Sequence, residues 1–144
     1  MFRFMDYSKA FIVATSLALP FAASAQSGDA YPSRSVKILV PYAPGGATDI
    51  IARILAAKLT ESLNQSFVVE NRTGASGNLA LEAVAKAPAD GYTLFVGNVS
   101  TNTINENTFA STLTIKPSRD LVGIAKLVEI PHIIATSADF PANS

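Results

Sequence analysis

The stretch that most constrains this chain runs from Val36 to Asp49 and reads VKILVPYAPGGATD. Its first five residues are nearly all apolar, which is typical of a strand covered on both faces in a parallel sheet. A Pro-Gly-Gly turn follows, and the pattern IIARILAAKL predicts a helix that begins at Thr48 or Asp49. The first N–H groups of such a helix are unpaired and lie at the positive end of its dipole. The turn is therefore suited to hold an anion without a charged side chain.

Composition excludes several classes of function. A chain of 144 residues predicts one domain, and its 49% apolar and 15% charged content indicates a globular core. The formal net charge is zero and there is no basic patch, so we expect no nucleic-acid partner. Because there is no cysteine, disulfides and cysteine metal sites are excluded, and we expect neither a metal nor a cofactor.

The first 25 residues have the pattern of a secretory signal peptide. An apolar run over 10–23 is followed by Ala23-Ser24-Ala25, the small-x-small pattern that signal peptidase accepts. A membrane anchor is the alternative, but the run is short for a bilayer. The expected organisation is a signal peptide at 1–25, a polar leader at 26–35 and a folded domain at 36–144, in the periplasm.

Strands and helices alternate along the rest of the chain. Strands are predicted at 36–40, 67–70 and 92–96, helices at 50–63 and 79–87, a polar loop at 97–107, and two further strands within 121–136. The inward face of the first helix is predicted to hold Ile50, Ile51, Ile54, Leu55 and Leu59. This order predicts an α/β fold with a doubly wound, mainly parallel sheet. Right-handed crossovers would bring the glycine-rich turns to one sheet edge, where ligands bind in such folds.

Three loops at this edge carry residue types that suit a carboxylate. Glycine allows close approach of the backbone, and Thr48 can cap the helix or offer its hydroxyl. Asp49 is expected to cap the helix or brace the loop rather than to contact the ligand. The predicted ligand-binding residues are Tyr42, Pro44, Gly45, Gly46, Ala47, Thr48 and Asp49, then Gly74, Ala75, Ser76, Gly77 and Asn78, and finally Ser100, Thr101 and Asn102.

These residues also have purely structural explanations. A Gly-Gly pair can form a tight turn without a ligand, Ser76 and Asn78 can cap the second helix, and the third loop can be solvated. Tyr42 can pack in the core instead of walling a pocket. Arg72, taken as the only cation near the turns, is expected to pair with Glu70 or face solvent.

Several motifs, in this order and spacing, resemble the periplasmic receptors of tripartite tricarboxylate transporters, the Bug family. They are PGGATD at 44–49, VVENRTGASGN at 68–78, ADGYTL at 89–94, STNTIN at 100–105 and DLVGIAKLVEIP at 120–131. The resemblance implies a periplasmic-binding-protein-like (Venus flytrap) fold, in which two lobes hold a small carboxylate. It also implies delivery of that ligand, unchanged, to the membrane components of the transporter.

The resemblance also sets expectations for length and for the site. Family members are more than twice as long as the expected mature chain, so the chain is expected to be a first lobe truncated before the second. Asn102 stands where many members carry His. The resemblance would also allow Asp49 to select ligands that bear an amine.

Three other classes of function are alternatives. An enzyme is disfavoured because the single histidine, His132, lies in an apolar run, and no nucleophile elbow or Walker lysine is present. A secreted module that binds protein is the second alternative. A non-functional remnant is the third, because an absent second lobe would leave apolar surface uncovered.

Overall fold

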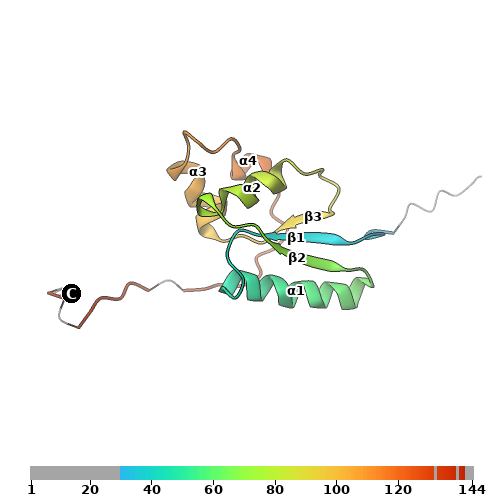
Figure 1. The fold of residues 1–144 in the computed structure, drawn as a ribbon, viewed down its shortest axis with the longest axis horizontal. Helices are drawn as coiled ribbons and strands as arrows, with labels where there is room; N and C mark the ends of the chain where they lie inside the picture. Colours follow the sequence, from blue (N-terminus) through green and yellow to red (C-terminus); the bar gives the residue numbers. More distant parts are fainter. Residues whose placement is uncertain (1–29, 132, 139, 142–144) are drawn as a thin grey trace, which may run out of the picture. The chain divides into compact units, whose positions relative to one another are not determined.

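The computed structural model describes residues 30–131, 133–138 and 140–141 (Figure 1). The expected signal peptide, the first residues of the expected leader and His132 lie outside this part of the chain. Within the described residues, no helix combines the length and apolar character needed to cross a bilayer.

Three parallel strands form one sheet in the order β2-β1-β3. The strands are β1 (Val36–Val40), β2 (Phe67–Asn71) and β3 (Thr93–Phe95). At the centre of the sheet, Ile38 of β1 lies opposite Val69 of β2 and Leu94 of β3. The central position explains why β1 is almost entirely apolar, because helices cover both of its faces.

The two long helices lie on opposite faces of the sheet (Figure 1). Helix α1 (Ala47–Leu63) connects β1 to β2, and α2 (Asn78–Ala85) connects β2 to β3. The chain thus leaves β1 in one direction and returns past it in the other, which confirms the predicted doubly wound α/β fold. The loops that follow β1 and β3 diverge at this switch point, the usual ligand position in such sheets. The shorter helices are η1 (Ala75–Gly77), η2 (Ser100–Ile104), α3 (Asn105–Thr108) and α4 (Pro117–Asp120).

Helix α1 turns a different face to the sheet from the predicted one. Ala52 and Ala56 are buried, and Asp49 is buried one turn before them. Ile50 and Ile54, predicted to face inward, are 50% and 61% exposed, so that prediction is wrong for both. The burial of the Asp49 carboxylate sets the rotation of the helix, and small alanine side chains then allow it to lie close to the strands.

The two strands predicted within 121–136 are also wrong. The described residues after α4 form no helix or strand, and Val122 and Ile134 are 91% and 100% exposed. A strand needs a neighbour that pairs with its N–H and C=O groups. No described strand pairs with this segment, so apolar composition alone does not make it a strand.

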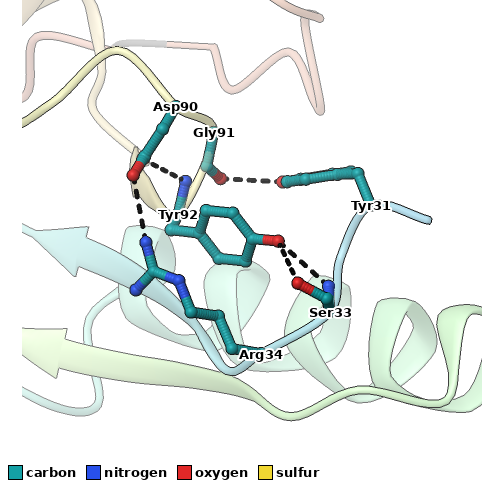
Figure 2. A network of polar contacts seen from close by, with 6 residues as sticks. All are labelled: Tyr31, Ser33, Arg34, Asp90, Gly91 and Tyr92. Atoms are coloured by element: carbon teal, nitrogen blue, oxygen red, sulfur yellow. Dashed lines mark hydrogen bonds and ion pairs between the residues drawn. The ribbon is translucent and has the colours of Figure 1, made fainter. Parts of the chain in front are cut away.

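A cluster of polar contacts joins the segment before β1 to the turn before β3 (Figure 2). Its residues are Tyr31, Ser33, Arg34, Asp90, Gly91 and Tyr92. The Ser33 N–H donates to the Tyr92 hydroxyl at 3.0 Å, and Arg34 pairs with Asp90 at 3.0 Å. The Arg34 guanidinium also lies 3.9 Å from the centroid of the Tyr92 ring. We call this cluster the clasp; it contains half of the ADGYTL motif and lies at the amino ends of the strands.

The clasp predicts a stability effect for Tyr92→Phe. This change removes the hydroxyl bonded to Ser33 but keeps the ring against Arg34, so we expect the free energy of unfolding to fall by about 0.5–1.5 kcal/mol. Urea denaturation measures it. Tyr31→Phe is the matched control; it loses a single bond to the Gly91 carbonyl on a half-exposed side chain, and we expect a smaller loss. An unchanged urea midpoint for Tyr92→Phe would show that the hydrogen bonds between the Tyr92 hydroxyl and Ser33 do not stabilise the fold.

Candidate functional site

Three loops meet at the carboxyl ends of the strands. The first loop (41–46) follows β1, the second loop (72–77) follows β2, and the third loop (96–105) follows β3 and includes η2. These are the three segments in which the predicted ligand-binding residues lie, apart from those that begin α1 and α2. The edge of the sheet opposite to the clasp therefore holds the whole candidate site.

Side-chain hydrogen bonds connect the loops to one another. The Tyr42 hydroxyl donates to Asn98 Oδ1 at 2.7 Å and so joins the first loop to the third. The Asn105 amide donates to the Ser76 carbonyl at 2.9 Å and to Asn78 Oδ1 at 2.7 Å, which joins the third loop to the second. The glycine turns that sequence patterns placed at one edge are thus parts of one connected structure.

Close packing at Gly77 brings the second loop against the other two. Gly77 has a φ of +90°, and a Cβ there would lie 2.7 Å from Thr101 Cγ2 and 2.9 Å from Pro41 Cβ. Only glycine combines this backbone conformation with so little space. Gly77 therefore has a structural role, and its N–H donates to the Gly74 carbonyl at 2.9 Å rather than toward a ligand.

The N–H groups at the start of α1 are free to bind an anion. The first hydrogen bond of the helix runs from the Ile50 N–H to the Gly46 carbonyl at 3.0 Å, and no side chain caps the helix. Among the described residues, none accepts a well-aligned hydrogen bond from the N–H groups of Gly46, Ala47 or Thr48. Gly46 and Ala47 are exposed and Thr48 is half-buried. The first loop thus keeps the unpaired donors that its sequence predicts.

Asp49 braces the first loop from the inside. Its side chain is only 3% exposed. Oδ2 accepts from Arg53 Nε and from the Gly45 N–H, both at 2.9 Å, and Oδ1 accepts from Asn71 Nδ2 at 2.8 Å. The bonds from Arg53, Gly45 and Asn71, in that order of effect, hold the pKa of Asp49 well below its usual range. The bond to Gly45 is the bracing contact predicted for Asp49, and a ligand amine would have to displace one of these donors.

The second loop is strained at two residues that remain accessible. Ala75 and Ser76 are exposed and have φ angles of +45° and +55°, which are uncommon for residues with a Cβ. Asn78 was predicted to bind the ligand or to cap α2. Its Oδ1 atom is used for neither. That atom accepts from Asn105, Asn78 is buried, and α2 has no side-chain cap.

The third loop is held by its own side chains. Thr101 is fully buried, and its hydroxyl accepts from the Asn98 N–H at 3.1 Å and lies 3.0 Å from Asn102 Oδ1. The Ser100 N–H donates to Asn98 Oδ1 at 3.0 Å. Thr101 therefore shapes the loop, while Asn102 is exposed and Ser100 half-buried at its surface.

The structure thus divides the predicted residues into two groups. The residues that remain exposed or half-buried at the surface of the loops are Pro44, Gly46, Ala47, Thr48, Gly74, Ala75, Ser76, Ser100 and Asn102, although the N–H groups of Ser100 and Asn102 are bonded to Asn98. The residues engaged within the protein are Tyr42, Gly45, Asp49, Gly77, Asn78 and Thr101. A ligand would bind to residues of the first group, and the residues of the second group hold the loops in their conformation.

Two residues of the site were not found from the sequence. Arg53 pairs with Asp49, so the prediction that Arg72 is the only cation near the turns is wrong. The sequence could have indicated this ion pair, because Asp49 and Arg53 are four residues apart on a helix, and residues at this spacing are neighbours on its surface. Asn71, a polar residue that ends β2, was also overlooked. Arg72 lies 3.8 Å from Glu70, the predicted partner.

Known sequences resemble this chain over most of its length. Residues 51–144 match the model of a family described as Tripartite tricarboxylate transporter family receptor. Protein BugT of Bordetella pertussis is 35% identical over 144 residues, which are 100% of this chain and 43% of the relative. A UPF0065 protein of Pseudomonas sp. strain P51, from the tcbD-tcbE intergenic region, is 39% identical over 115 residues, 80% of this chain and 34% of the relative.

Solved structures resemble part of the chain. MatC of Rhodopseudomonas palustris with bound malate is 40% identical, with a TM-score of 0.59 over 62% of this chain and 30% of that one. A periplasmic transporter structure is 43% identical, with a TM-score of 0.59 over 61% of this chain and 29% of that one. This chain therefore spans less than half the length of these relatives.

The packing at Gly77 predicts a large effect of one added methyl group. Gly77→Ala places a Cβ against Thr101 and Pro41 at a φ that disfavours alanine, and we expect the free energy of unfolding to fall by about 2 kcal/mol or more. Gly46→Ala is the matched control. Gly46 has a φ of −74° and its added Cβ would meet only the Ala43 carbonyl at 3.7 Å, so we expect a loss of about 1 kcal/mol at most. Equal losses in urea denaturation would contradict this packing.

The buried Asp49 carboxylate predicts a pH-dependent stability difference. Its pKa is lower in the folded chain than the value of about 3.9 in an unfolded one, so its ionised form stabilises the fold above about pH 4. That contribution declines as the pH falls below this value. We therefore expect Asp49→Asn to be less stable than the unmodified chain at pH 7, by a difference that narrows below about pH 4.

Urea denaturation at several pH values measures this difference. Glu61→Gln is the control, because Glu61 forms an exposed ion pair with Lys58 on the same helix, and such pairs contribute little. A difference for Asp49→Asn that stays constant from neutral to acidic pH would show that the carboxylate is not held in its ionised form.

Proposed function

We propose a function for this chain from the premise that it belongs to the tripartite tricarboxylate transporter family of receptors. In this proposal it is a periplasmic protein that binds a small carboxylate and serves the membrane components of such a transporter. The family consists of solute-binding receptors for transport and is not enzymatic, in agreement with the expectation that the chain is not an enzyme.

The observation that carries the proposal is the row of free N–H groups at Gly46, Ala47 and Thr48. A carboxylate that leaves water loses strong hydration and must find several donors in return. Each hydrogen bond to a charged group contributes about 1.5–3 kcal/mol, and the helix dipole adds about 0.3–1 kcal/mol. These donors follow β1 at the switch point of the sheet, and the Asp49 carboxylate beside them is buried and paired with Arg53.

The ligand class follows from the same donors. Main-chain N–H groups recognise the carboxylate group itself and not the rest of the molecule. The malate bound to MatC, which is 40% identical to this chain, supports a small acid of this kind. The described loops supply donors on one side only, so we expect the chain alone to bind malate with a dissociation constant of about 1 mM, roughly −4 kcal/mol.

Titration of the ¹⁵N-labelled full chain with malate, followed by NMR, tests the proposal. We expect saturable shifts of the N–H signals of Gly46, Ala47 and Thr48, because these are the free donors. Malate dimethyl ester, which lacks the charge, should cause none, and sodium chloride at matched ionic strength controls for salt. If neither malate nor other small carboxylates shift these signals, a remnant without function or a protein-binding module becomes the better explanation.

Gly46→Val provides the matched variant for this titration. The backbone at Gly46 accepts a side chain without a clash, so we expect the fold to persist. The valine side chain would crowd the free N–H groups, and we expect the malate-dependent shifts to disappear. Equal loss of binding and stability would make the turn purely structural.

A further inference from the structure

Three polar side chains form a closed ring behind the first loop. Arg53 donates through Nε to Asp49 Oδ2 and through Nη2 to Asn71 Oδ1, both at 2.9 Å. Asn71 in turn donates through Nδ2 to Asp49 Oδ1 at 2.8 Å. Each member is bonded to the other two, so the ring ties the first turns of α1 to the end of β2. We call this cluster the Asp49 ring.

The Asp49 ring holds the first loop at two points. Asp49 accepts from the Gly45 N–H at 2.9 Å, and Asn71 donates to the Tyr42 carbonyl at 3.0 Å. Only Ala43 and Pro44 lie between these two attachments. The free N–H groups of the candidate site follow directly after Gly45, at the start of α1.

Packing does not provide an alternative support for this loop. Residues 43–47 are all exposed, and a Cβ added to Gly45 would meet no atom within 4 Å. Gly45 also has a φ of +88°, and because glycine adopts positive and negative φ angles about equally readily, its backbone alone does not select this conformation. Pro41 and Tyr42 have further contacts at Gly77 and Asn98, but the hydrogen bonds from the Asp49 ring fix the path of the exposed part of the loop, 43–45.

The Asp49 ring also reduces the repulsion between the Asp49 carboxylate and an anionic ligand. A free carboxylate at Asp49 would repel an anionic ligand at the neighbouring N–H groups. The Arg53 guanidinium pairs with it and offsets this charge, while both oxygens still accept the bonds that brace the loop. A neutral residue at position 49 could not accept through two oxygens in this way.

We propose that Arg53 and Asn71 are positioning residues of the carboxylate site. Acting through Asp49 and the Tyr42 carbonyl, they fix the first loop in its binding conformation before the ligand arrives, and neither serves as a ligand donor. Preorganisation of this kind increases affinity because the loop need not be ordered on binding. The ligand part of this inference rests on the proposed function, but the effect on the loop does not.

Two variants in the full chain test the inference. Arg53→Gln removes the charge and the fork that spans two partners, and Asn71→Ala removes the contact to Tyr42. For each, we expect exchange of the Gly45 amide hydrogen to accelerate by about tenfold or more, and the malate dissociation constant to rise about tenfold. Because both act on one loop, the double variant should be little worse than either single one.

Two further variants provide controls. Lys58→Gln breaks an ion pair on the same helix, with Glu61 at 2.7 Å, and should change neither measurement. Arg53→Lys keeps the charge but not the planar fork. It disturbs the fold less, and it replaces Arg53→Gln in both measurements if that variant does not fold. Protection of the Ile38 amide in β1 reports that the sheet remains intact in each variant.

The outcomes separate this inference from the proposed function. Unchanged Gly45 exchange in folded variants of Arg53 and Asn71 would overturn the positioning role, even if the chain binds malate. Accelerated exchange in a chain that never binds malate would support bracing by the ring and remove the proposed ligand. Unchanged malate affinity despite accelerated exchange would also overturn the inference, because the loop conformation would then not matter for binding.

Discussion

The buried carboxylate of Asp49 is the interaction on which the rest of the site depends. It is enclosed by donors from Gly45, Arg53 and Asn71. To reach them, α1 must rotate so that Asp49 and the alanines that follow it face the sheet. The same rotation leaves Ile50 and Ile54 exposed, although apolar side chains usually take the inward face. One polar residue thus sets both the packing of the helix and the path of the loop before it.

The topology of the sheet separates stability from binding. Because all three strands are parallel, their amino ends lie at one edge and their carboxyl ends at the other. The clasp closes the first edge through Arg34, Tyr92 and their neighbours (Figure 2). The three loops occupy the second edge, joined by Tyr42 and Asn105. Changes in the clasp can therefore alter stability without touching the candidate site.

Local features of the sequence were sufficient for most of the fold. The strand at 36–40 was predicted with its observed bounds, because an apolar run ended by a Pro-Gly-Gly turn is decided by neighbouring residues. The rotation of α1 was not predictable in this way, since it depends on contacts from Asn71 on another element. The same reason explains the wrong strands within 121–136, because pairing is not a local property. In the candidate site, the turn sequence predicted the free donors, but the Asp49 ring joins α1 to the end of β2 and was not predictable from neighbouring residues.

A cradle of neutral donors would also suit the proposed function, in which the ligand must be released. Arg53 in α1 and Arg72 in the second loop are each paired with an acidic residue. Attraction for an anion therefore comes mainly from N–H groups and the helix dipole, which act over short distances. A small displacement of the loop would weaken several such bonds together, whereas a free guanidinium would continue to attract the anion at longer range. Under the proposed function, the Asp49 ring would therefore control the affinity because it controls the loop.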